Sequence, residues 1–537
     1  MAGLGRSNSK EELIAFLESP ESYPHRPTGV RAIQTHISWV FAASPFVFKV
    51  KKPVNLGFLD FSTPEKRHYF CQREIELNRR LCPNIYLEAV PIYKNDSAFS
   101  FKAPGDIVDY AVKMKELPHG WFLNELLEKN LVGEKEIDRV ISVLRQFYQA
   151  ETPRPEIEQW GTPEKLKIST DENFTQVESF IGKTISPAAF DAIRHYTNRF
   201  YVMNERLFYK RIQQHRILDC HGDLHLEHVH LAPEATTIFD CIEFNDRFRF
   251  IDIANDLAFL AMDFDFKGRG DLGNLFLRNA ARELGDDEML KVANFYRCYR
   301  AFVRGKVESI QATEKETTNP QEHEKEAARY FRLALRYAVA GSEPLILVVM
   351  GRVASGKSTI AKRLAGELDW PVFSSDEIRK TLAGVPLDRR TPLALREKMY
   401  SAQMTRRTYR ELVEGGVGAL KKDRGVILDA TFSTPALRKL LRDESKRANV
   451  QFRFVELEVH PNEIKNRLQN RNEKTAEASD ARLEDFEKLN ASCEPPSERT
   501  PDLIRVSTRT SVADAVKASL MRLAEKQSGG TDCRAVL

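Results

Sequence analysis

A run of small and basic residues past the middle of the chain has the composition of a phosphate-binding loop. Residues 345–359 read LILVVMGRVASGKST, which contains the spacing G-x-x-x-x-G-K-[ST] after an apolar strand and before a helix. Glycines let successive backbone N–H groups turn toward phosphate oxygens, and the helix aims its positive N-terminus at the same anion. We expect Lys357 to reach the β- and γ-phosphates and Ser358 to hold Mg²⁺. The alternative is a glycine turn before an ordinary helix. The pattern predicts a site for ATP and Mg²⁺ built from Gly351, Ser355, Gly356, Lys357, Ser358 and Thr359.

Two carboxylates follow apolar strands that come after this loop in the sequence. Asp376 lies in WPVFSSDEIR and Asp429 lies in VILDATF. Because ligands bind at the carboxyl ends of parallel strands, both side chains should face the phosphates. Asp376 is suited to accept the proton of an attacking hydroxyl, and Arg379, one helical turn later, to bind an anionic group of the acceptor. Asp429 is suited to order the Mg²⁺ shell or the substrate. The alternative for Asp376 is a purely structural helix N-cap.

Two arginines occupy one face of a later helix. Arg467 and Arg471 lie at positions i and i+4, where like charges repel unless an anion lies between them. A triphosphate would be such an anion, and the arginines would then stabilise the charge that spreads during transfer. The polar stretch 472–482 suits a lid that excludes water. A solvated basic helix face is the alternative.

Taken together, residues 345–525 resemble the small P-loop kinases related to gluconate and shikimate kinases, polynucleotide 5′-kinases and zeta-toxin-like kinases. The resemblance is carried by GRVASGKST, SSDEIR, VILDATF and the arginine pair of RLQNR. It implies that Asp376 is the general base and that Arg379 contacts the acceptor phosphate. It also implies that Arg467 and Arg471 belong to the lid.

A second group of polar residues lies in the first half of the chain. The segment LDCHGDLHLEHVHL (218–231) is followed by IFDCIEF (238–244), so that acidic residues end two closely spaced apolar strands. Such carboxylates could converge on one divalent metal ion. His221 and His225 could instead ligate zinc, although no third ligand stands at zinc spacing. A hairpin held by polar hydrogen bonds is the further alternative.

This segment resembles the H-G-D-x-H-x-x-N loop of the aminoglycoside phosphotransferases, which have a kinase-like bilobal fold. The resemblance implies that Asp223 is catalytic, that His225 lies at the substrate, and that Asp240 binds metal. His228 stands at the position of the family's metal-binding asparagine, so the resemblance implies that it is a metal ligand, although imidazole is a poorer ligand for Mg²⁺. Upstream, Lys49 fits the phosphate-pairing lysine and Glu74 its ion-pair partner, with Lys51 and Glu76 as rivals. The glycine-rich turn of the family is absent, and residues 35–38 read THIS in its place.

The elements that must position these residues fall into two patterns. The first half mixes strands near 30–60 and 88–116 with a helix over 64–82 and a mainly helical body. Beyond residue 344, strands at 345–350, 371–374, 425–430, 452–458 and 503–507 alternate with helices. Such alternation is typical of a parallel α/β sheet. We therefore expect an α+β kinase-like bilobal domain over 1–340, an α/β P-loop NTPase domain with a parallel sheet over 344–525, and a disordered tail over 526–537.

Composition and net charge indicate which classes of partner and which compartment are favoured. The 537 residues are 42% hydrophobic and 29% charged, with a formal charge of +4, so nucleic acid is an unfavoured but open partner. Seven scattered cysteines, no leader and no membrane span favour a cytoplasmic protein. We expect an ATP-dependent bifunctional phosphotransferase acting on hydroxyl groups of small molecules. The alternative is an active P-loop kinase, for example a polynucleotide 5′-hydroxyl kinase, with an N-terminal ligand-binding or pseudokinase regulatory domain.

Overall fold

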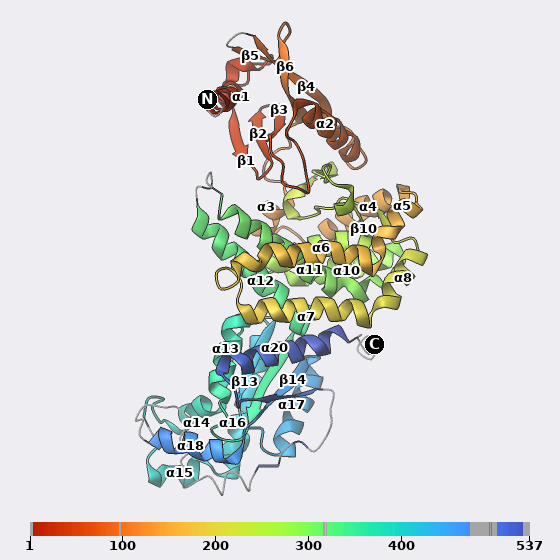
Figure 1. Ribbon diagram of the computed structural model, residues 1–537. Helices are drawn as coiled ribbons and strands as arrows, with labels where there is room; N and C mark the ends of the chain where they lie inside the picture. Colours follow the sequence, from red (N-terminus) through yellow and green to blue (C-terminus); the bar gives the residue numbers. More distant parts are fainter. Residues whose placement is uncertain are drawn as a thin grey trace. The chain divides into compact units, whose positions relative to one another are not determined.

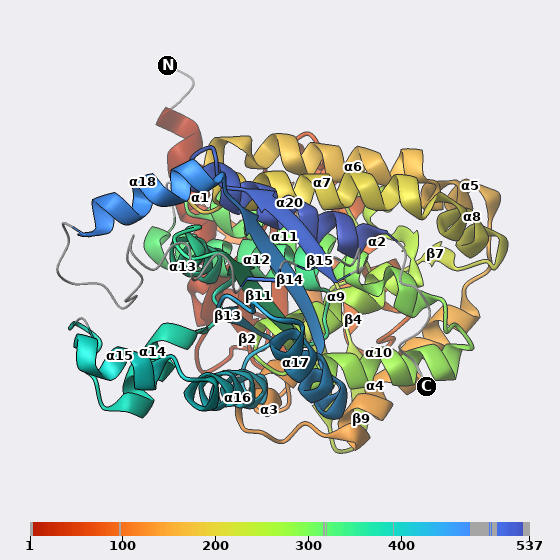
Figure 2. The ribbon, with the colours of Figure 1, turned by 90° about the horizontal axis from the view of Figure 1, so that it is seen from below.

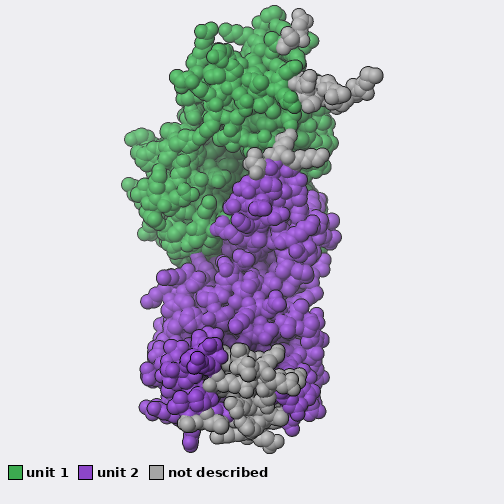
Figure 3. Space-filling model, turned by 90° about the vertical axis from the view of Figure 1, so that its left-hand side faces the viewer, with its two compact units in different colours: residues 1–169, 206–297 green, residues 170–205, 298–537 purple. Residues whose placement is uncertain are grey.

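The computed structural model describes residues 4–95, 98–314, 317, 319–389, 391–472, 493–494, 496 and 502–529. The chain divides into two compact units, coloured separately in Figure 3. Unit 1 comprises residues 1–169 and 206–297, and unit 2 comprises residues 170–205 and 298–537. The boundary expected at residues 341–344 therefore lies inside unit 2. Among the described residues, no helix is both long and apolar enough to cross a membrane.

Unit 1 begins with an antiparallel sheet whose strand order is β1-β2-β3-β6-β4-β5. Its strands are β1 (Arg31–Gln34), β2 (Ser38–Ala43), β3 (Phe46–Lys51), β4 (Tyr86–Asn95), β5 (Ala98–Ser100) and β6 (Asp106–Lys115). The first helices are α1 (Leu4–Glu18) and α2 (Pro64–Asn78), and α2 lies along β4 and β6 (Figure 1). Helix α2 begins after Thr63, whose hydroxyl accepts a hydrogen bond from the Lys66 backbone N–H, with Pro64 in the first helical turn.

The side chains of β3 alternate between the two faces of the sheet, and this alternation determines which of them face α2. Phe48 and Val50 point into a core shared with Leu13 and Leu17 of α1. Because successive strand residues face opposite sides, Lys49 and Lys51 lie on the other face, which α2 covers. Two lysines are thus placed beneath a helix that carries Glu74.

The rest of unit 1 consists of helices around two short strand pairs. Strand β7 pairs antiparallel with β10, and β8 pairs antiparallel with β9. The loop after β7 carries Asp223, and the turn after β9 carries Asp240. The elements are α3 (Leu123–Glu128), α4 (Glu134–Ala150), α5 (Pro155–Glu158), α6 (Pro163–Val177), α8 (Glu205–Gln213), β7 (Ile217–Asp219), β8 (Val229–Ala232), β9 (Ala235–Ile238), β10 (Phe250–Asp252), α9 (Ile253–Phe266), α10 (Gly270–Leu284) and α11 (Met289–Gln311), of which α6 and α11 continue into unit 2.

Unit 2 contains a five-stranded, entirely parallel sheet with the order β12-β13-β11-β14-β15. The central strand β11 (Leu345–Gly351) is buried over its whole length, as expected for a strand covered on both faces. The other strands are β12 (Val372–Ser374), β13 (Gly425–Asp429), β14 (Gln451–Glu458) and β15 (Leu503–Ser507). This architecture confirms the parallel α/β sheet predicted for the C-terminal half.

Helices from distant parts of the sequence complete unit 2. Helix α20 (Val512–Ser528) packs against α7 (Pro187–Met203) and α12 (Pro320–Ala340), and Figure 2 shows α20 running beside α7. The remaining helices are α13 (Lys357–Leu368), α14 (Ser375–Ala383), α15 (Leu393–Met399), α16 (Ala402–Ala419), α17 (Pro435–Ala448) and α18 (Pro461–Asn472). Since α20 ends at Ser528, helical structure continues past residue 525, and the rest of the predicted tail lies outside the described residues from 530 onward.

Candidate functional site

The phosphate-binding loop connects β11 to α13, as the sequence predicts. Gly351 and Gly356 have φ angles of +143° and +95°, conformations that side chains with a Cβ disfavour. A Cβ atom on Gly351 would also lie 2.9 Å from the Leu457 carbonyl oxygen of β14. Both glycines are therefore required by the backbone path, which brings the loop to the N-terminus of α13.

The polar side chains of the loop lie close to its own backbone. Lys357 Nζ donates a hydrogen bond of 2.9 Å to the Arg352 carbonyl oxygen, so that its ammonium group lies over the loop. Ser355 Oγ is buried and has no hydrogen-bond partner among the described residues. Ser358 and Thr359 are exposed in the first turn of α13. The Lys357 ammonium group and the hydroxyl groups of Ser355, Ser358 and Thr359 therefore lie at the loop and the N-terminus of α13, where an anion would bind.

Asp429 is placed against this loop by the register of the sheet. As the last residue of β13, it pairs with Val349 of β11 and with Ser374 of β12. Its side chain is 5% exposed and accepts a hydrogen bond from the Ser358 hydroxyl. Burial raises the pKa of Asp429, the nearby Asp376 and Glu377 carboxylates raise it further, and the Ser358 hydrogen bond and the Lys357 ammonium oppose this rise. A hydroxyl bonded to a carboxylate is the oxygen donor set that Mg²⁺ prefers, so these two residues fit the ion.

Asp376 and Arg379 both lie on α14 but have different surroundings. Asp376 lies two residues after Ser374, which is the register partner of Asp429. The Asp376 carboxylate is close enough to raise the pKa of Asp429. Arg379 is buried, and its guanidinium group donates to the Met399 carbonyl oxygen at 2.8 Å and to Thr405 Oγ1 at 3.2 Å. The same group lies over the ring of Tyr400, 4.9 Å from its centroid. Arg379 thus connects α14 to the junction of α15 and α16, while its Nε has no hydrogen-bond partner among the described residues.

Arg467 contacts the phosphate-binding loop from α18. Its NH1 group donates to the Ser355 carbonyl oxygen at 3.3 Å, and its NH2 group donates to the Thr508 carbonyl oxygen at 3.1 Å. Thr508 Oγ1 also donates to the Ser355 carbonyl oxygen, at 3.3 Å. Arg467 therefore holds the loop to the segment between β15 and α20. The side chain of Arg471 and most of the predicted lid, from residue 473 onward, lie outside the described residues.

A cavity of about 690 Å³ opens beside the loop in unit 2. It is lined by Gly351 and Arg352, by Thr431–Ser433 after β13, and by the ends of β14 and β15. Its charged lining includes Arg352, Arg505 and Arg509 together with Glu456, Glu458 and Glu494. Sequence reasoning missed these residues, because only the sheet order brings the end of β14 and the end of β15 beside Gly351.

In unit 1, the structure brings Lys49, Glu74 and Asp240 together in an ionic network in which Glu74 is buried and Lys49 and Asp240 are partly buried. Lys49 Nζ lies 2.9 Å from Glu74 Oε1 and 2.5 Å from Asp240 Oδ1. Lys51 Nζ lies 2.6 Å from Glu74 Oε2 and also pairs with Glu243. Both lysines therefore share Glu74, while the rival Glu76 is exposed and pairs with Arg73. Although burial alone would lower the pKa of Lys49, the carboxylates of Asp240, Glu74 and Glu243 raise it well above its usual value.

The loop after β7 is held by carboxylates that point at its backbone. Asp256 accepts hydrogen bonds from the backbone N–H groups of His221 and Gly222, at 3.0 Å and 2.9 Å, and from the Tyr148 hydroxyl at 2.9 Å. Asp263 accepts another from the Leu226 N–H at 3.0 Å. The supporting residues Tyr148 and Asp263 were not found from the sequence, because only the packing of α4 and α9 brings them to the loop.

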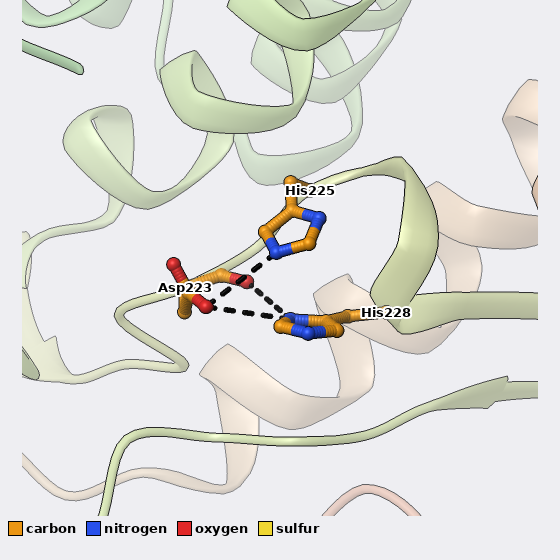
Figure 4. A group of neighbouring side chains, drawn as sticks. All are labelled: Asp223, His225 and His228. Carbon is orange, nitrogen blue, oxygen red and sulfur yellow. Dashed lines mark hydrogen bonds and ion pairs between the residues drawn. The ribbon is translucent and has the colours of Figure 1, made fainter. Parts of the chain in front are cut away.

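Asp223, His225 and His228 form a compact group at the end of this loop (Figure 4). Asp223 Oδ2 lies 3.5 Å from His225 Nε2 and 3.6 Å from His228 Nδ1. His228 Nδ1 donates a hydrogen bond of 2.9 Å to the Asp223 carbonyl oxygen, and His228 Nε2 lies 3.5 Å from Asp240 Oδ2. The predicted catalytic, substrate and metal residues of unit 1 are thus neighbours.

The protonation of this group follows from burial and charge. Burial, reinforced by the neighbouring His225, lowers the pKa of His228 to about 4, so that its imidazole is neutral at neutral pH. Burial alone would raise the pKa of Asp240, but Lys49 and His228 lower it to about 2. Asp240 supplies a carboxylate that suits Mg²⁺, whereas the imidazole of His228 is a poor ligand for that ion. The residues of unit 1 therefore do not fit a Mg²⁺ site of the kind the resemblance implies.

Comparison with known proteins identifies relatives of the chain. A family model described as an AAA domain matches residues 346–496, which places the phosphate-binding loop in a nucleotide-binding P-loop domain. The uncharacterized protein Rv2004c of Mycobacterium tuberculosis (strain ATCC 25618 / H37Rv) is 31% identical over 423 residues, or 78% of this chain and 82% of the relative. The uncharacterized protein Mb2027c of Mycobacterium bovis has the same identity and coverage. A solved gluconokinase from Sinorhizobium meliloti 1021 is 20% identical, with a TM-score of 0.26, and covers 34% of this chain and 92% of that chain.

Proposed function

We propose, from the premise that this chain belongs to the same family as the mycobacterial protein Rv2004c, that it is an ATP-dependent bifunctional phosphotransferase. Each half would transfer the γ-phosphoryl group of ATP to a hydroxyl group of a small molecule. The observation that supports the proposal is that Asp429, at the end of β13, lies beside Ser358 and Asp376 at the phosphate-binding loop, where these residues would serve as metal ligands and as the base.

In unit 2, the proposed reaction is an in-line displacement at the γ-phosphorus. The acceptor oxygen forms the new bond to phosphorus, its proton passes to the Asp376 carboxylate, and the bond to the β–γ bridging oxygen breaks to release ADP. Lys357 would leave the Arg352 carbonyl and donate to the phosphate oxygens. Ser358 and Asp429 would hold Mg²⁺, which when bound neutralises charge on the β- and γ-phosphates.

The acceptor of unit 2 is proposed to enter the cavity beside Gly351. The cavity is lined by both arginines and glutamates, so a polar acceptor with several hydroxyl groups suits it better than an apolar one. Arg467 would act by holding the loop in shape, and Arg471 would join it at the phosphates. The buried Arg379 would contact the acceptor only through the part of its guanidinium group that is not engaged by Met399 and Thr405.

In unit 1, the resemblance to aminoglycoside phosphotransferases supports a second, kinase-like site within residues 1–340. Asp223 would orient and deprotonate the acceptor hydroxyl, with His225 beside it. Lys49, held by Glu74, would pair with the phosphates of a second ATP molecule. The ion pair between Lys49 and the buried Glu74 supports this assignment, because such a pair positions the lysine before the nucleotide arrives.

Two substitutions in the full-length protein test the bifunctional proposal. The purified protein is screened for ATP consumption with a library of hydroxyl acceptors. Lys357→Ala should abolish transfer to one acceptor, and Asp223→Ala should abolish transfer to a different one, because each residue serves only its own unit. No ATP turnover by the unsubstituted protein with any acceptor would refute the proposal.

An alternative function for unit 1 is favoured by its own geometry. Lys49 is already neutralised by Asp240 at 2.5 Å, and His228 stands where the resembled family has an asparagine. Unit 1 would then be a ligand-binding or pseudokinase domain that regulates an active P-loop kinase. In that case Asp223→Ala would leave every transfer reaction intact. A 5′-hydroxyl oligonucleotide belongs in the same screen, because phosphorylation of its end would identify the P-loop unit as a polynucleotide kinase.

A further inference from the structure

Positive charge is concentrated in one short segment of unit 2, which begins at Asp376. Residues 376–410 contain nine Lys and Arg residues against four Asp and Glu residues. The formal charge of the whole chain is only +4, so the rest of the protein is close to neutral. A local excess of cations of this kind is the electrostatic footprint of a surface that binds a polyanion.

The segment folds into three helices that pack on one another. Helices α14, α15 and α16 contact each other and lie side by side in Figures 1 and 2. Arg379 of α14 joins them, because its guanidinium group donates to the Met399 carbonyl oxygen and to Thr405 Oγ1. The end of α15 and the start of α16 are therefore held together by one side chain.

Three arginines of α16 and a lysine of α15 form an exposed basic face. Arg410 lies four residues after Arg406 and three residues after Arg407, so the three side chains are neighbours on the helix surface. Lys398 is exposed at the end of α15. Within the described part of the chain, none of these four residues forms an ion pair. Like charges so spaced repel one another, and a bound polyanion would remove that repulsion.

An exposed aromatic ring adjoins the basic face. Tyr400 is 43% exposed, and the Arg379 guanidinium group lies over its ring, 4.9 Å from the centroid. Surfaces that bind single-stranded nucleic acid combine cations that follow the backbone with aromatic rings on which unpaired bases stack. An acidic peptide would use the cations but not the ring, and a small phosphorylated molecule would engage only part of the face.

The basic face also lies near the residues proposed for catalysis. Tyr409 directly precedes Arg410, and its hydroxyl forms a 2.8 Å hydrogen bond with Thr431 Oγ1, after β13. Burial raises the pKa of this hydroxyl, and both Arg379 and Asp376 lie close enough to act on it. A strand on the basic face would therefore have its end within reach of Asp376.

We propose that the basic face of Lys398, Arg406, Arg407 and Arg410 binds the phosphate backbone of a single-stranded nucleic acid, with a base stacked on Tyr400. The 5′-hydroxyl oxygen of the strand would be the acceptor in the displacement proposed for unit 2. This inference deepens the polynucleotide alternative for that unit, in which the acceptor is a strand end rather than a small molecule in the cavity beside Gly351. It rests on that function for the role of the strand. Binding itself is measured without ATP, so the two can fail separately.

The experiment measures binding of a labelled single-stranded DNA of about 12 nucleotides to the full-length protein at several NaCl concentrations. Each phosphate contact contributes about −0.7 to the slope of the logarithm of the binding constant against the logarithm of the salt concentration. The triple variant R406Q, R407Q and R410Q should therefore bind with a slope that is shallower by about 2, and at least tenfold more weakly at ~0.1 M salt. Tyr400→Leu should weaken binding about tenfold without changing the slope, because stacking releases no counterions.

A second triple variant is the matched control for charge. K439Q, K446Q and R447Q together remove the same charge from α17, another helix of unit 2 on which these three residues are exposed. This variant should keep the slope of the unsubstituted protein, since α17 lies outside the basic face. Far-UV circular dichroism establishes that each variant is folded. If the α16 variant is not, K398Q with R410Q replaces it, with a slope expected to be shallower by about 1.4.

Several results would overturn the inference. They are the absence of binding by the unsubstituted protein at low salt, and equal effects of the α16 and α17 variants. Displacement of the strand by polyglutamate of equal charge would indicate an acidic protein partner instead, and displacement by a dinucleotide at equal phosphate concentration would indicate a small phosphorylated acceptor. Strand binding without phosphorylation of the 5′ end would leave the basic face standing and remove only the role of the strand as acceptor.

Discussion

At the scale of single residues, the environment decides which of several similar side chains can do chemistry. Glu74 and Glu76 lie two positions apart on α2, yet only Glu74 is buried against Lys49 and Lys51. The environment also sets Asp429 apart from an ordinary surface carboxylate. Its carboxylate is buried next to other acidic groups and lies beside the Ser358 hydroxyl. In its ionised form, such a buried carboxylate lowers the stability of the folded protein. Buried carboxylates of this kind are found at functional sites, and a bound metal ion would compensate the charge.

Replacing Asp429 by asparagine should therefore stabilise the protein and inactivate unit 2. The folded-state pKa of Asp429 is raised, so the ionised carboxylate costs stability at pH values above that pKa, and the cost disappears as pH falls through it. A neutral isostere removes the cost at pH 7, a gain of about 1 kcal/mol. Thermal unfolding in the absence of metal ions measures the change. A lower melting temperature for Asp429→Asn at pH 7 would contradict this account.

At the scale of elements, the unit formed by β11, the phosphate-binding loop and α13 contains one glycine that the backbone requires and another that could be replaced by a residue with a side chain. Gly351 has neither the space nor the φ angle for a side chain, whereas Gly366, on the exposed face of α13, has no atom within 4 Å of the position of a Cβ. The same residue type thus serves opposite purposes within one strand-loop-helix unit.

Two glycine substitutions should have opposite effects on stability. Gly351→Ala should destabilise the fold by about 1–3 kcal/mol, because it strains the backbone and meets the Leu457 carbonyl. Gly366→Ala should stabilise it by about 0.5–1 kcal/mol, because alanine favours the helix. Denaturant unfolding of the two variants gives both values. Equal effects of the same sign would show that the loop is not built as described.

The contact between α18 and the loop makes a separate prediction for Arg467. Arg467→Met should raise the KM for ATP more than it lowers kcat, because the side chain contacts loop carbonyls that shape the phosphate site. Arg447→Met is the control, since Arg447 is exposed on α17 and pairs with the neighbouring Glu444. A kcat loss at unchanged KM would instead indicate that Arg467 touches the transferring phosphoryl group.

At the scale of the whole molecule, the parallel sheet does not form a unit by itself. Helices α7 and α12, which come from the first 340 residues, pack on α20 within unit 2, and α12 also contacts α13. Arg336 of α12 donates to the Leu368 carbonyl oxygen at 2.7 Å, and Ser186 donates to Glu367 Oε2 at 2.6 Å. The C-terminal half of the chain therefore depends on the adjacent helix α12 and on α7, which precedes the sheet by more than a hundred residues.

A fragment comprising residues 344–529 should consequently be less stable than the same sheet in the full chain. Removing α7 and α12 exposes the apolar faces of α20 and α13, including Leu520 and Leu523, which are buried in the intact protein. We expect a melting temperature at least several degrees lower, or aggregation on expression. A fragment that unfolds at the temperature of the full chain would support the boundary at residues 341–344 that the sequence suggests.

The local elements were predictable because they depend on short-range patterns. The strands expected at 345–350, 425–430, 452–458 and 503–507 appear within one or two residues as β11, β13, β14 and β15. The loop from Gly351 to Ser358 follows from spacing alone, since its chemistry lies in its own backbone. In the first half, the helix that carries Glu74 was likewise expected, although α2 ends at Asn78.

Long-range placement required the folded chain. No sequence pattern reveals that Arg467 would hold the phosphate-binding loop, that Tyr148 would support the loop of Asp223, or that α7 would pack on α20. These contacts join residues far apart in sequence, and they depend on strand order and on helix packing rather than on local propensity. Chemical type and spacing thus located the candidate groups, whereas burial and long-range packing determined which of them meet, because only a three-dimensional core can bring distant charges together and exclude water from them.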